Sequence, residues 1–182
     1  MPRARRASPA VARASLLSTL AGAPRDRPGN TWIAGQRVRF LLDQSYRATH
    51  YLHEALTAAR DCRGDDWFCE SLVGLVFSHQ RQIDSAQAAF ARARTHASDT
   101  LRCQMADITG LLDRAAVPRE FVVPTSCIAK RALAERYWWL ADALWSDDIN
   151  ERRVEHEART VTLPVSYTHL EPTQPYYISY AV

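Results

Sequence analysis

The stretch over residues 67–94 constrains the fold more than any other part of this 182-residue chain. Its apolar residues recur at the three- and four-residue steps of two successive helices. Small Gly74 and Ala86 allow two antiparallel helices to approach closely, while Phe77 and Phe90 fill the space beside them. The pattern therefore predicts a packed helix pair and an all-α protein.

The residues that carry this packing resemble the tetratricopeptide repeat in type and spacing: Val73, Gly74, Phe77, Ala86, Phe90 and Ala93. The chain departs from the repeat at three positions, where Glu70 replaces an aromatic residue, Arg81 a turn glycine and Ser98 a closing proline. The resemblance implies antiparallel helix hairpins stacked as a short α-solenoid over residues 31–113.

The segments flanking this pair also have helical patterns. Apolar residues over 38–59 share one face and predict a helix that ends near Arg60. One repeat period before the clear pair, Leu52 and Leu56 fit the second helix of a degenerate preceding unit. A helix over residues 99–113 would begin a third unit or cap the stack, because helical repeats need neighbours to bury their faces.

The C-terminal part begins with a connector over residues 114–124, where two prolines and a β-favouring run predict extended chain. Residues 125–160 then predict two helices, one to about Trp145 and a charged one to about Arg159. The first is rich in aromatic residues: Tyr137, Trp138, Trp139 and Trp145. A buried seam against the repeat helices is the favoured interpretation, and a platform that stacks nucleobases or another ligand is the alternative.

Three pairs of polar residues stand where helices should begin: Asp65 with Asp66, Thr125 with Ser126, and Asp147 with Asp148. The side chains of these residue types accept backbone hydrogens at helix starts. We therefore interpret both aspartate pairs as helix caps and not as paired catalytic carboxylates.

The positive charge lies in one segment. The net charge is +3, but residues 1–30 contain six arginines and one aspartate, or +5, which leaves the remainder at −2. We interpret residues 1–30 as a basic flexible leader, so no basic folded face for nucleic acid is expected. The alternatives are an arm that binds nucleic acid or a membrane surface, and an export signal built on the short apolar stretch 16–21.

Residues 161–182 form a second distinct end, because arginine and the helical period both disappear there. The segment resembles translated sequencing-adaptor read-through of the kind found in metagenomic assemblies, and a genuine extended tail is the alternative. We expect it to be irregular. No run in the chain approaches the roughly 20 apolar residues of a membrane span, so no integral membrane segment is expected.

A second resemblance rests on two segments, WIAGQRVRF near residue 32 and RYWWLADALWSDDINERRVEHEAR in the C-terminal part. They are similar to uncharacterised bacterial proteins in which tetratricopeptide-like helices precede a WWLADPL-like stretch and then a segment named for its GWxTD motif. The resemblance covers residues 31–160 and implies an exported or envelope-associated protein, without established activity or catalytic residues. Ala143 stands where a proline is common, and no GWxTD motif follows. We therefore expect the front part of a longer protein.

The four cysteines, Cys62, Cys69, Cys103 and Cys127, include no C-x-x-C pair, so a zinc site has little support. Buried reduced thiols would suit a cytoplasmic protein. Disulfides joining Cys62 to Cys69 and Cys103 to Cys127 would suit an exported one. The bacterial resemblance favours the disulfides and an exported or periplasmic location.

The most enzyme-like feature is His50, His53 and Glu54 on one helix, with His79 on the next. The two histidines lie one turn apart and could share a metal. The motif is not H-E-x-x-H, however, and histidines on a helix rich in charged residues are more often solvated or packed. We predict no catalytic residues, no metal and no cofactor.

These observations favour a non-enzymatic scaffold whose groove between stacked helix pairs binds a peptide or a helix of a protein partner. Candidate groove residues are Glu70, Ser71 and His79, on the first helix of the clear pair. The alternative is a helical accessory domain of a larger exported enzyme or envelope protein.

Overall fold

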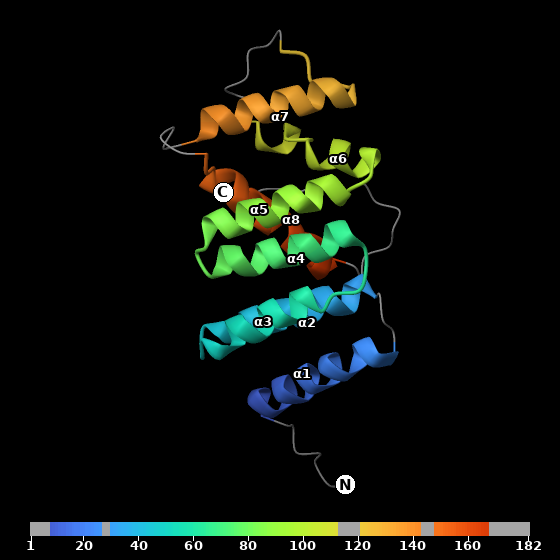
Figure 1. Cartoon of the computed structure of the whole chain (residues 1–182), viewed down its shortest axis with the longest axis vertical. Coiled ribbons are helices and arrows are strands. Elements are labelled where there is room, and N and C mark those ends of the chain that lie inside the picture. Colours follow the sequence, from blue (N-terminus) through green and yellow to red (C-terminus); the bar gives the residue numbers. More distant parts are fainter. Residues whose placement is uncertain (1–7, 27–29, 113–120, 143–147, 168–182) are drawn as a thin grey trace, which may run out of the picture.

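The computed structural model describes residues 8–26, 30–112, 121–142 and 148–167. Within these ranges all regular secondary structure is helical, which confirms the all-α prediction. The elements, shown in Figure 1, are α1 (Pro9–Asp26), α2 (Thr31–Ser45), α3 (His50–Arg60), α4 (Asp66–His79), α5 (Ile83–His96), α6 (Asp99–Met105), the 3-10 helix η1 (Thr109–Leu111), α7 (Cys127–Ala141) and α8 (Glu151–Tyr167).

Along the long axis of the molecule α1 lies at one end, α2 and α3 come next at one level, and α4, α5, α6 and α7 follow in chain order to the other end (Figure 1). From α1 to α5 each helix packs against the next, most extensively α4 against α5 and α2 against α3, and α6 packs against α7. Helix α8 breaks this order, because it returns from the α7 end and packs against α4, α5 and α2.

The packing of α4 against α5 depends on Gly74. A β-carbon at that position would lie 2.7 Å from the Phe90 ring, which is well inside van der Waals contact. Ala86 and Ala93 are fully or almost fully buried beside them, and Val73 is buried as well. The small side chains thus set the distance between the two helices, as the sequence pattern predicted.

The turn between α4 and α5 has the geometry of a glycine C-cap without a glycine. Arg81 has a φ of 60°, in the left-handed region. The Gln82 N–H donates to the Phe77 carbonyl at 3.0 Å and the Arg81 N–H to the Ser78 carbonyl at 3.1 Å. These two bonds form a Schellman motif, so the backbone keeps the turn although the arginine is strained in it.

The single helix expected to end near Arg60 is instead two helices, α2 and α3. Asn30 caps α2 through its side chain, which accepts from the Ile33 N–H at 3.1 Å. The chain then turns over residues 46–49 without glycine or proline, and Tyr46 and Thr49 keep right-handed helical dihedral angles. The turn lets α3 fold back along α2, which buries apolar residues of both helices against each other.

The aromatic helix is only partly buried. Ser126 caps α7 by accepting from the Ala129 N–H at 3.3 Å, but α7 ends at Ala141. Trp138 and Ala134 form a small cluster with Ile108 beside η1, separate from the main core. Trp139 is 64% exposed, and Trp145 lies outside the described residues. Trp138 is therefore buried against the end of the predicted repeat region, next to α6 and η1, and not against α4 or α5.

The helix expected over residues 99–113 is shorter. Ser98 caps it by accepting from the Leu101 N–H at 3.3 Å, but α6 ends at Met105 and η1 follows. Residues 121–124 of the expected connector are non-helical, and residues 113–120 lie outside the described part.

Both chain ends contain more helix than the sequence predicted. Pro9–Asp26 form α1 within the segment interpreted as a flexible leader. Leu20 is buried and Leu17 packs against the main core, so even a short apolar face holds this helix in place. At the other end α8 continues to Tyr167, past the expected boundary near Arg159, and residues 168–182 lie outside the described part.

Candidate helix-binding face

The most informative surface of the molecule is the one that α8 covers. It is formed by α2, α4 and α5, and we call it the α8-covered face. Val154, Ala158 and Val161 of α8 are buried there in the main core. Their spacing of four and then three residues places them on one side of the helix. The α8-covered face thus already receives one amphipathic helix of this chain.

The start of α8 is held by the Gln87 side chain of α5 and by a hydrogen bond that the Asn150 side chain donates to the Trp138 carbonyl of α7 at 2.6 Å. The Gln87 amide nitrogen donates to the Asp148 carbonyl oxygen at 2.7 Å, and the Asn150 N–H donates to the Gln87 amide oxygen at 2.9 Å. The Asn150 side chain in turn accepts from the Arg153 N–H at 2.9 Å. Asn150 therefore takes the capping role that the sequence assigned to Asp147 or Asp148, because its amide oxygen reaches the free N–H groups of the first turn.

Two turns further along, α5 and α8 are joined by charge. The Arg94 guanidinium donates to the Glu157 carboxylate, and both side chains are more than two-thirds buried. Arg153 on α8 lies 3.4 Å from the same carboxylate and forms a two-pronged pair, at 3.1 Å for each contact, with Glu135 on α7. This network links α5, α7 and α8 by hydrogen bonds to charged groups.

His156 lies between the main core and the small cluster. Its ring centroid is 5.1 Å from that of Trp138. Burial lowers the pKa of His156 below its ordinary 6.5, and the positive charge of Arg159 lowers it further. The imidazole is therefore more readily kept neutral in the folded protein than in water.

The three groove residues chosen from the sequence do not form one surface. Ser71 is 1% exposed and donates its hydroxyl to the Trp67 carbonyl at 2.7 Å. That bond one turn back along the helix allows the hydroxyl to be buried, so Ser71 cannot meet a ligand and its assignment to the groove is wrong. Glu70 pairs with Arg92 on α5 at 3.0 Å. His79 lies exposed at the far end of α4, where desolvation nonetheless lowers its pKa against a smaller raising effect of Asp43.

The residues of the possible metal site lie at the surface. His50 is 3.8 Å from Glu54 within α3, and both side chains are more than half exposed. His53 is exposed on the same helix. Among the described residues, no group of three or more potential ligands is arranged to bind a metal ion.

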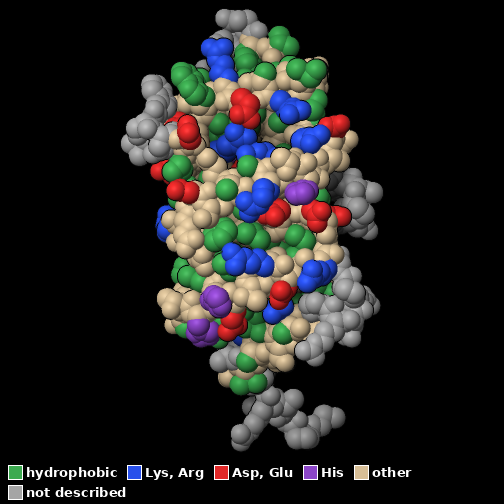
Figure 2. All heavy atoms as spheres, in the orientation of Figure 1, with side chains coloured by type: hydrophobic (Ala, Val, Ile, Leu, Met, Phe, Trp, Pro, Cys, Tyr) green, Lys and Arg blue, Asp and Glu red, His purple; other side chains and the backbone are tan. Residues whose placement is uncertain are grey.

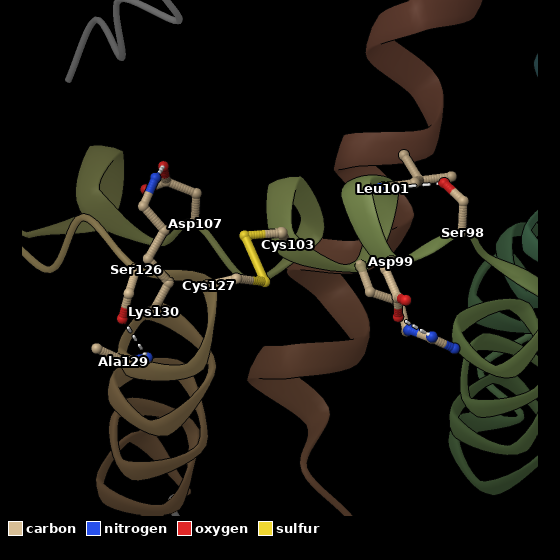
Figure 3. The surroundings of a disulfide bond; sticks show 10 residues. Ser98, Asp99, Leu101, Cys103, Asp107, Ser126, Cys127, Ala129 and Lys130 are labelled. Atoms are coloured by element: carbon tan, nitrogen blue, oxygen red, sulfur yellow. Dashed lines mark hydrogen bonds and ion pairs between the residues drawn. A yellow bond between two sulfur atoms is a disulfide. The ribbon is translucent and has the colours of Figure 1, made fainter.

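Two disulfides join segments that are close together in the chain. Cys62 is joined to Cys69 and Cys103 to Cys127, with Cα atoms 5.5 and 5.2 Å apart. The second disulfide connects α6 to the first residue of α7 (Figure 3). Lys130 of α7 also forms an ion pair with Asp107, in the short segment between α6 and η1, so α7 is held by a covalent contact to α6 and an ionic contact just after it.

Outside the α8-covered face, the surface has an open cavity, a few exposed apolar residues and mixed charge. An open cavity of about 340 Å³ lies between α7 and the start of α8 and is lined by Trp138, Trp139 and charged side chains of both segments. Ile128 and Leu140 on α7 are also exposed. Positive and negative side chains alternate over the face seen in Figure 2 without a large region of one sign.

The contacts that hold α8 could not be found from local sequence patterns. Gln87 and Arg94 have no distinguishing neighbours in the sequence. Gln87 and Arg94 are seven positions apart on α5, and their partners Asn150 and Glu157 are also seven positions apart, so both contacts can form at once. That correspondence is visible only once the two helices are known to lie together.

None of the described helices combines the length and apolar character needed to cross a membrane. Comparisons of the chain with protein-family models, with curated proteins and with solved structures found no match.

Proposed function

We propose that this chain is a non-enzymatic helical scaffold that binds a protein or peptide partner. In this proposal α2 with α3 and α4 with α5 are two stacked hairpins of a short tetratricopeptide-like solenoid. The observation that carries the proposal is the α8-covered face, where an amphipathic helix is held by buried small side chains and by side chains of α5. Helix-in-groove binding uses the same combination between two proteins.

Glu70 and His79 of α4 test whether the partner also contacts α4 outside the α8-covered face, because their side chains reach the surface whereas Ser71 is buried. The experiment uses the full chain as bait in its native host, identifies the proteins retained, and repeats the binding with each purified partner by calorimetry. A saturable one-to-one complex that weakens at least about tenfold in the Glu70→Ala/His79→Ala variant is expected, a loss typical of interface residues.

Gln104→Ala on α6 is the matched control, since this side chain is exposed and lies away from α4. A partner that binds the variant of Glu70 and His79 as tightly as the wild-type chain would remove these two residues from the interface. Absence of any saturable complex would remove the proposed function.

A second candidate is a helical accessory domain of a larger exported protein, and the disulfides favour it. Disulfides persist in oxidising compartments and are rare in the cytosol. The Cα atoms of both cysteine pairs lie at separations that suit a disulfide. Alkylation of denatured protein from its native host, with and without reductant, tests the location: four blocked thiols support export, and four free thiols contradict it.

A further inference from the structure

We propose that α8 is an exchangeable internal ligand, and that the α8-covered face binds a helix of another protein in its place. The proposal rests on the proposed function and specifies the partner. That partner is an amphipathic helix with small apolar residues on one side and a carboxylate two turns after its capping residue.

The register between α5 and α8 supports a specific recognition site. Gln87 contacts the backbone at Asn150, and Arg94 contacts Glu157. Both pairs of residues are seven positions, or two turns, apart along their helices. The helices therefore run in the same direction, and a shift of one turn would break both contacts together.

The two contacts differ in what they require of a partner. Gln87 binds backbone atoms through both ends of its amide, so it accepts any sequence at the start of a helix. Arg94 requires a carboxylate, because a guanidinium that is more than two-thirds buried would, without an anion, lose hydrogen bonds that water cannot fully replace. A partner is thus oriented by its first turn and selected by its charge.

The apolar contacts restrict side-chain size. Position 154 holds valine, position 158 alanine and position 161 valine, all at most 9% exposed. Counted from the capping residue Asn150, these are the fourth, eighth and eleventh positions, and the carboxylate is the seventh. Larger side chains at these positions would overpack the face.

Helix α8 is attached more weakly than the helices beneath it. Three of the described side chains of α8 are buried, whereas seven residues of α4 are buried, including Phe68 and Leu72. Elements with few buried apolar contacts open most readily in native proteins. Helix α8 can therefore detach locally while α4 and α5 remain packed through Gly74 and Phe90.

The test uses a fluorescein-labelled peptide of residues 148–162 as probe, with binding to the full chain measured by anisotropy. The chain variant Glu157→Lys loses its contact with Arg94, so α8 is displaced more easily and the free peptide competes better. We expect the peptide to bind this variant at least about tenfold more tightly than the wild-type chain, since an internal competitor reduces apparent affinity by the occupied fraction.

Glu155→Lys provides the matched control in the chain. Glu155 carries the same charge on the same helix but pairs with Arg159 of α8 itself. Chains with wild-type sequence and with Glu155→Lys should bind the peptide equally. Equal affinity of the Glu157→Lys and Glu155→Lys chains, or no binding to either, overturns the proposal.

Hydrogen exchange of the wild-type full chain gives a second test that requires no variant. Amides of α8 should exchange at least about tenfold faster than those of residues 72–76 in α4, as expected for local opening. Equal protection of α8 and α4 overturns the proposal, because α8 would then be a permanent part of the core. That result would leave the proposed scaffold function intact. Absence of a partner complex would instead remove the scaffold function, and it would not change the hydrogen-exchange rates of α8.

Discussion

The Phe90 ring lies directly over Gly74, so close that a β-carbon at position 74 would be 2.7 Å from the nearest ring atom. Gly74→Ala therefore forces the ring or the whole of α5 to move. Overpacking of this kind costs about 1–3 kcal/mol of unfolding free energy. Urea denaturation measures the loss. Gly22→Ala in α1 is the control, since its β-carbon meets nothing within 4 Å, and it should be neutral or stabilising by up to about 1 kcal/mol.

Arg81→Gly should make the protein more stable. Arg81 has a φ of 60°, which L-residues other than glycine adopt at a cost of about 1–2 kcal/mol. Glycine relieves this strain but loses more freedom on folding, which leaves a gain of about 0.5–1 kcal/mol. Thermal and urea unfolding should show the increase. Unchanged or reduced stability would mean that the arginine side chain makes a contribution larger than the strain.

The Arg94–Glu157 pair should be worth more than the exposed pairs of α8. A double-mutant cycle with Arg94→Gln and Glu157→Gln is expected to give a coupling energy of about 1–2 kcal/mol, because both side chains are largely removed from solvent. The Glu155–Arg159 pair is the reference, with about 0.3–0.5 kcal/mol expected for exposed charges one turn apart. Equal coupling for the two pairs contradicts the anchoring role of Arg94.

His156 should make the protein less stable in mild acid. Its folded pKa is lowered below 6.5, so the folded state favours the neutral ring and the unfolded chain binds the proton first. The free energy of unfolding therefore has its full value above about pH 6.5, and it decreases as the pH falls through the folded pKa of His156. Urea midpoints between pH 8 and pH 5 measure the slope, which His156→Gln should reduce. His79 contributes a slope of the same sign, because desolvation lowers its pKa too.

The disulfides should contribute unequally. Cys62 and Cys69 are 7 positions apart, and Cys103 and Cys127 are 24 apart. Loop-closure entropy then predicts about 2 kcal/mol for the first and about 3 kcal/mol for the second. Replacing each pair by alanine and measuring unfolding free energy separates them. A peptide map that links other cysteines would refute the pairing itself.

The sequence predicted those helices whose boundaries have a local cause. The pairing of α4 with α5 follows from the small and aromatic residues that pack around Gly74, and the start of α7 from Ser126, one of the two residues expected to cap it. The break between α2 and α3 escaped prediction, because Tyr46 and Thr49 keep helical dihedral angles and neither glycine nor proline interrupts the apolar period. The sequence pattern therefore predicted a single helix, although tertiary packing folds these residues into α2 and α3.

The candidate site was less accessible to sequence reasoning. Ser71 resembled a surface residue by its type, yet its hydroxyl is satisfied within α4 and the side chain is buried. The contacts of Gln87 and Arg94 with α8 join residues about sixty positions apart, which no local period encodes. Helix α8 itself was predicted, but its place on α2, α4 and α5 was not.

The position of α8 also has a consequence for synthesis on the ribosome. Contacts between α2 and α8 join segments separated by roughly a hundred residues, whereas α4 meets α5 across a short turn. The α4–α5 pair can therefore assemble while translation continues, and its apolar face stays uncovered until α8 emerges. During that interval the nascent chain presents to chaperones and neighbouring proteins the surface that the finished molecule encloses.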